Sequence, residues 1–83
     1  MKVQIRYFAS VREALATSGE TVETDAGTLA ALRDELIARG GAYATALARG
    51  KAVRMALDQV MSDEAASLRE GAEVAFFPPV TGG

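Results

Sequence analysis

Hydrophobic and polar residues alternate in three stretches of the chain, and a period of two predicts strands that bury one face. The alternating apolar residues are Val3, Ile5 and Tyr7 in the first stretch, Val53, Met55 and Leu57 in the second, and Val74 and Phe76 in the third. Residues 20–24 predict a further strand, paired with the first as in a hairpin. A turn at residues 58–59 leads into a brief strand at 60–61.

The last of these strands, residues 73–77, presents an aromatic residue on each face. Val74 and Phe76 form the bulkier pair and are assigned to the core, which leaves Phe77 at least partly exposed. Phe8 follows the first strand out of its buried register. Because single exposed aromatic side chains are common, the residues alone give a partner-binding role and an ordinary surface position equal weight.

A helix over residues 28–39 is predicted by an apolar stripe at helical spacing. The stripe consists of Leu29, Leu32, Leu36 and Ile37. Thr28 is expected to cap its first turn, and Glu35 to pair with Arg39 one turn later on the solvent face. The glycine pair at 40–41 is expected to end the helix in a left-handed conformation.

A shorter helix over residues 11–16 is predicted by Ser10 and Glu13, which fit the S-x-x-E capping box. A further helical turn is expected at residues 42–47.

This order of elements does not alternate between strand and helix and indicates an α+β domain. The β-grasp arrangement fits best, with helix 28–39 packed across a mixed sheet and the final strand central beside the first. We expect a domain over residues 1–77 and a flexible tail over residues 78–83.

The composition excludes several kinds of chemistry. None of the 83 residues is cysteine or histidine, which removes disulfides, zinc sites and every catalytic arrangement that needs a thiol or an imidazole. A formal net charge of −2 argues against nucleic-acid binding. A first strand that alternates, together with the lack of any long apolar run, predicts a cytoplasmic protein with no membrane segment.

The last residues therefore become the main candidates for chemistry. Pro78 and Pro79 end the sheet and favour an extended exit, although they could simply terminate a strand. Gly82 and Gly83 gain nothing for stability, because ordering glycine costs the most backbone entropy. Without side chains they could pass down a narrow channel and leave the terminal carbonyl open to a nucleophile.

The C-terminal carboxylate is ionised at neutral pH and is a poor electrophile until it is activated. The chain has no P-loop or other nucleotide motif, so adenylation would come from another protein that uses ATP, and no cofactor is expected on this chain. A sulfur nucleophile could then give a thiocarboxylate, or a lysine amine an isopeptide.

Residues 71–83, with the sequence GAEVAFFPPVTGG, resemble the closing signature of the small subunit of molybdopterin synthase, a ubiquitin-like sulfur carrier. Residues 3–13 are similar to that family's first strand and helix. Asp58 departs from the pattern, since relatives often carry asparagine before Gln59. The resemblance covers nearly the whole chain.

The resemblance implies that Gly83 is adenylated by an E1-like enzyme, thiocarboxylated, and then donates sulfur to cyclic pyranopterin monophosphate in the large synthase subunit. The tail, with Pro78, Pro79, Val80, Thr81 and Gly82, would insert into that subunit. Phe77 and Phe8 would contact partners, and Arg12 and Lys51 would lie near the same surfaces unless they are only solvated charges.

Three alternatives stay open. A sulfur carrier of thiamine synthesis also ends in two glycines but is usually shorter and lacks the Phe-Phe-Pro-Pro run. A ubiquitin-like modifier would be attached to lysines. A β-grasp binding module would carry a tail without function.

Overall fold

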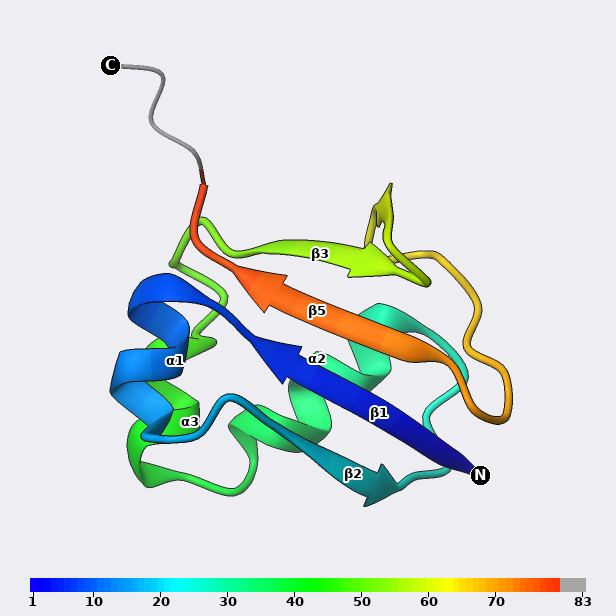
Figure 1. The fold of residues 1–83 in the computed structure, drawn as a ribbon. Coiled ribbons are helices and arrows are strands. Elements are labelled where there is room, and N and C mark those ends of the chain that lie inside the picture. The colour runs from blue at the N-terminus through cyan, green and yellow to red at the C-terminus, as the bar shows by residue number, and fades with distance from the viewer. Residues whose placement is uncertain (80–83) are drawn as a thin grey trace.

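The structure, a computed structural model, describes residues 1–79. In chain order its elements are β1 (Lys2–Tyr7), α1 (Ala9–Leu15), β2 (Gly19–Glu23), α2 (Leu29–Ile37), α3 (Gly41–Ala46), β3 (Arg54–Leu57), β4 (Val60–Ser62) and β5 (Glu73–Phe77). One sheet has the strand order β2-β1-β5-β3-β4. Central β5 runs parallel to β1 and antiparallel to β3 (Figure 1). The predicted β-grasp sheet, mixed and with the last strand beside the first, is confirmed.

The core lies between this sheet and the helices on one of its faces. α2 crosses that face, and α1 lies near the end at which β5 finishes (Figure 1). The alternating residues Val3, Ile5 and Tyr7 are at most 1% exposed, and Val74 and Phe76 are fully buried, as predicted. The stripe of α2 also faces the core, with Leu29, Leu32 and Leu36 fully buried and Ile37 partly buried.

The capping box predicted for the first helix is wrong. Phe8 is the N-cap residue, and no side chain caps this helix end. The Phe8 N–H donates to the Phe76 carbonyl at 3.1 Å, so pairing with β5 continues to Phe8. The chain then turns at Ala9, whose φ is 50°, and Ser10 already lies inside the first turn. A capping box needs the serine in front of the helix.

The second helix begins as predicted but ends earlier. The Ala31 N–H donates to the Thr28 hydroxyl at 3.2 Å, which confirms the cap. The helix ends at Ile37, and Gly40 and Gly41 have φ values of 77° and 55°, consistent with glycines that end a helix. Arg39 therefore lies beyond the helix, where the spacing that would bring it to Glu35 no longer holds.

The predicted pair of Arg39 with Glu35 is accordingly wrong. Arg39 instead binds Glu20 of β2, with 2.9 Å between Nη1 and Oε1. The hydroxyls of Tyr7 and Tyr43 donate to the other oxygen of Glu20 at 2.8 and 2.7 Å. Burial alone would raise the pKa of Glu20, but the hydrogen bonds from Tyr43, Arg39 and Tyr7 outweigh it and lower that pKa. Burial, with help from Glu20, raises the pKa of Tyr7.

The remaining elements follow the sequence. The helical turn expected at residues 42–47 is α3. Asp58 and Gln59 join β3 to β4 with φ values of 49° and 69°, a two-residue hairpin turn with both residues left-handed. Among residues 1–79, no helix combines the length and the hydrophobicity needed to cross a membrane.

Candidate functional site

The central strand leads directly to the candidate tail. Phe77, the last residue of β5, lies opposite Arg54, the first residue of β3. Pro78 and Pro79 follow at once and are half-buried. Since proline has no N–H to donate, the strand ladder ends there. The predicted site residues Val80, Thr81, Gly82 and Gly83 lie outside the described residues.

A groove of about 430 Å³ lies beside the two prolines. Its other walls are formed by α1, the end of α3 and residues 50–53. Lys51 belongs to this last wall, so it lines the same groove as Pro78 and Pro79, and its role toward a partner stays a prediction. Arg12 is exposed on α1 and does not line the groove.

The sheet face opposite the helices carries an apolar strip. Phe8, Ala56, Met61, Ala75 and Phe77 form this outer strip, because strand alternation turns each of them away from the core. Ala75 lies opposite Ala56, which in turn lies opposite Met61. Phe8 is 43% and Met61 57% exposed, whereas Phe77 is half-buried.

The register also explains why two predicted residues meet. Tyr7 lies beside Phe76 in the parallel β1·β5 pair, and continuing this register places Phe8 beside Phe77. A hollow of about 460 Å³ on the same face is lined by Phe8, Ala75, Arg6, Gln59 and Glu73. Both aromatic residues therefore lie at the end of the sheet from which the tail leaves.

The cations of this end are not used by the fold. Arg6, Arg12, Lys51 and Arg54 form no ion pair with another residue of the range 1–79. Arg33, Arg39 and Arg49 are all paired. Arg6 lies opposite Ala75 and Arg54 opposite Phe77, so these two cations adjoin the outer strip and are available to a partner's acidic groups.

The sequence alone did not single out Ala56, Met61 and Ala75. Each is an ordinary strand residue, and only the pairing of β3 with β4 and β5 brings the three into one row across the outer face. The available signal was the alternation itself, since Ala75 and Ala56 are apolar at positions where a solvent-facing strand usually carries polar residues. Nor did the sequence indicate that Arg33 is buried.

Comparison with known proteins identifies the family. The model of the ThiS family matches residues 5–83. The molybdopterin synthase sulfur carrier subunit of Escherichia coli (strain K12) is 41% identical over 81 residues, which cover 98% of this chain and 99% of the relative. The subunit of the same name from Haemophilus influenzae is 36% identical over the same shares of both chains.

Solved structures agree on the fold. A putative molybdopterin converting factor subunit 1 from Pyrococcus furiosus has a TM-score of 0.79 at 24% identity, covering 96% of this chain and 99% of the other. SAMP1 from Haloferax volcanii has a TM-score of 0.77 at 22% identity over the whole of both chains. At these identities the likeness shows the fold alone. Together with the family model and the relatives above 30% identity, it confirms the resemblance seen in residues 71–83: the chain belongs to the ThiS family.

Proposed function

We propose that this chain is the sulfur carrier of a molybdopterin synthase and that the carboxylate of Gly83 carries the sulfur. Support comes first from relatives that bear this name and match the chain over nearly its full length at 36% and 41% identity. The observation that carries the proposal is the course of β5. β5 pairs with β1 on one side and β3 on the other and ends at Phe77. Pro78 therefore follows just beyond the sheet, beside the groove and the outer strip.

The chemistry begins with a carboxylate that must be activated. One of its oxygens attacks the α-phosphorus of ATP, pyrophosphate leaves, and an acyl adenylate forms on a partner enzyme. A hydrosulfide equivalent then attacks the carbonyl carbon and AMP leaves with the electron pair of the broken bond. The product is a thiocarboxylate on Gly83, which donates its sulfur to cyclic pyranopterin monophosphate, and water restores the carboxylate.

In these reaction steps, this chain presents its C-terminal carboxylate and provides the surface that its partner proteins recognise. With no cysteine, it has no thiol of its own from which the sulfur could come. The partners are an E1-like activating enzyme and the large synthase subunit. A structural neighbour from Helicobacter pylori, with a TM-score of 0.70 and 24% identity, was solved as a complex of subunits 1 and 2 of a molybdopterin-converting factor.

The outer strip is the surface that we assign to these partners. Exposed aromatic and Met side chains are enriched where proteins meet. Phe8 and Phe77 lie at the end of the sheet that leads to Pro78, and Met61 lies farther along the strip, on the other side of β3. A partner that covers the end of the strip at Phe77 would also meet Pro78, which follows directly. We therefore propose that one partner surface meets both the strip and the start of the tail.

An intact mass measurement tests the proposal. The chain is expressed with an activating enzyme and a sulfur donor, and we expect one oxygen to be replaced by sulfur. A matched chain without Gly83 should keep its unmodified mass and its fold. The proposal fails if the full chain also stays unmodified while a known carrier is converted in the same mixture.

The alternatives predict different products from the same activated carboxylate. A protein modifier would give conjugates to lysine amines, visible as a ladder that disappears when Gly83 is removed. A thiamine-pathway carrier would become thiocarboxylated but would support thiazole formation and not molybdopterin formation. A binding module without tail chemistry would show none of these products.

A further inference from the structure

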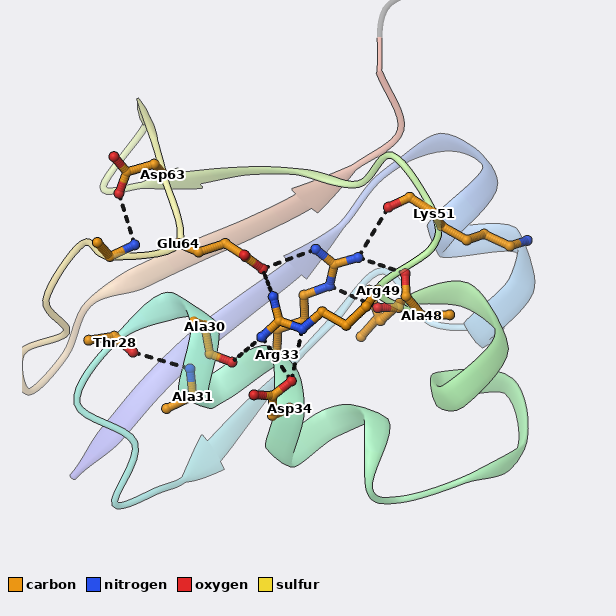
Figure 2. A network of polar contacts seen from close by, with 12 residues as sticks. Thr28, Ala30, Ala31, Arg33, Asp34, Ala48, Arg49, Lys51, Asp63 and Glu64 are labelled. Carbon is orange, nitrogen blue, oxygen red and sulfur yellow. Dashed lines mark hydrogen bonds and ion pairs between the residues drawn. The ribbon is translucent and has the colours of Figure 1, made fainter.

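Arg33 of α2 is a buried cation whose hydrogen bonds converge on one segment. It is only 4% exposed. Its Nε donates to the Leu47 carbonyl at 2.8 Å, and Nη2 donates to the carbonyls of Ala48 and Lys51 at 2.8 and 3.2 Å (Figure 2). Nη1 donates to Glu64 at 3.2 Å. A buried charge is costly unless it is fully paired, so these acceptors are needed.

The acceptors belong to the end of α3 and the turn after it. The last carbonyls of a helix have no partner within the helix and carry its negative dipole end. Arg33 supplies both donors and positive charge at that place. A lysine could not do the same, because one ammonium lacks the planar fork that reaches several carbonyls at once.

The segment held in this way forms one wall of the groove beside the tail. Residues 50–53 line the groove together with Pro78 and Pro79. β3 begins only at Arg54, so the strand ladder does not hold these residues. Their own backbone bonds are short-range, from Lys51 N–H to the Ala48 carbonyl and from Val53 N–H to the Lys51 carbonyl, both 2.9 Å.

Figure 2 shows how Arg33 and Lys51 are arranged. The Lys51 carbonyl points toward the Arg33 guanidinium, and the Lys51 side chain extends away from it. Arg49 connects the same two parts of the chain in the opposite direction, because it belongs to the segment and its side chain binds α2. Its Nη2 donates to Oδ1 of Asp34 at 2.8 Å, and its Nη1 donates to Glu64. The wall is thus fastened to α2 from both sides, with Arg33 as the buried member.

We propose that Arg33 is a positioning residue for the C-terminal tail. By fixing residues 47–51, it holds the wall against which Pro78 and Pro79 leave the sheet and so sets the direction in which the tail meets its partner. Arg33 acts through the segment that carries Lys51. The inference rests on the proposed function, in which the tail must enter an activating enzyme.

The test uses the full chain with Arg33→Lys and Arg33→Met. Arg33→Lys keeps the charge but loses the fork, and Arg33→Met keeps an unbranched apolar stem without the charge. Val22→Ala, in β2 and away from the groove, is the control, because it also removes core packing. All comparisons are made at a temperature at which each variant is at least nine-tenths folded.

The first measurement is hydrogen exchange of the Lys51 and Val53 amides. We expect the Lys51 and Val53 amides to exchange at least tenfold faster in both Arg33 variants than in Val22→Ala, compared at equal free energy of unfolding. The amides of β1 and β5 should exchange at the same rate in all three variants. The second is thiocarboxylation by the activating enzyme. We expect KM to rise at least threefold in the Arg33 variants with kcat unchanged, and neither constant to change in Val22→Ala.

The outcomes separate the two proposals. A wild-type chain that is never thiocarboxylated overturns the proposed function, and exchange then still decides whether Arg33 holds the wall. If wild type reacts and the Arg33 variants react with its KM, positioning is wrong. The same holds if Val22→Ala raises KM equally. Should Arg33→Met fail to fold, Arg33→Lys alone decides.

Discussion

Phe76 and Phe77 are the same residue type at adjacent positions, yet they face opposite sides of the sheet. Phe76 is fully buried and stacks on Tyr7, with 6.2 Å between ring centroids. Phe77 belongs to the outer strip and is half-buried. Substitution of Phe76 by alanine therefore serves as a control for the same substitution at Phe77.

We predict that Phe77→Ala weakens the complex with the large subunit more than it lowers the melting temperature. Burying an aromatic ring at an interface contributes about 2 kcal/mol or more to binding. Phe76→Ala should instead cost about 3–5 kcal/mol of folding free energy. Calorimetric titration and thermal unfolding of both variants check this pair. Equal losses of stability would place Phe77 in the core.

The Glu20 carboxylate predicts that the free energy of unfolding decreases at acid pH. Its pKa is lowered in the folded chain, so the unfolded state binds more protons as pH falls. The stabilisation is fully present above the ordinary pKa of a glutamate and is lost as pH drops through the lowered value. Urea unfolding from pH 7 to pH 3 should show a steeper loss in wild type than in Glu20→Gln. Parallel curves would contradict the role of the cluster.

At the scale of elements, the pairing of β2 with β1 depends on a glycine. A Cβ added at Gly19 would lie 2.5 Å from the Ile5 carbonyl oxygen, which is backbone and cannot move aside. Gly19→Ala should therefore cost about 1–3 kcal/mol. Gly27→Ala is the matched control, since a Cβ there meets nothing within 4 Å, and it should be neutral or stabilise by up to about 1 kcal/mol. Denaturant titration distinguishes the two.

The hairpin between β3 and β4 is a second element whose backbone is strained. Gln59 holds a φ of 69°, which glycine adopts without cost. Gln59→Gly should stabilise the fold by about 0.5–1 kcal/mol. Gln59 also lines the hollow on the outer face, so the same change should weaken partner binding. A loss of stability in Gln59→Gly would show that its side chain matters more to the fold than its backbone.

Prediction from sequence succeeded where the spacing of apolar residues within one strand or helix is enough to show which side faces the core. Val3, Ile5 and Tyr7, like Leu29, Leu32 and Leu36, needed only their own spacing to be assigned to the core. It failed where a distant element intervenes. The Phe8 N–H is bound by β5, which moves the helix start, and Arg39 is bound by Glu20, which lies 19 positions earlier. Arg33 resembles a solvent-facing helix cation until the carbonyls of residues 47–51 are placed around it.

In the whole molecule, the residues that form the core are different from the tail residues to which we assign the chemistry. Removing Gly82 and Gly83 deletes no side chain that could be buried, so the free energy of unfolding should stay within about 0.5 kcal/mol of wild type. Thiocarboxylation should be abolished. Denaturant unfolding and intact mass measure the two effects on one sample. A large loss of stability would show that the tail also contributes to the fold.

The central place of β5 has a consequence for how the sheet forms. β1 and β3 do not pair with each other, and both pair with β5, which is separated from β1 by all the other elements of the sequence. The sheet thus depends on contacts between distant parts of the sequence, which slows folding. A chain truncated before Glu73 lacks the strand that joins β1 to β3. We therefore expect such a chain to leave both strand edges unpaired and to be degraded by proteases faster than the full chain.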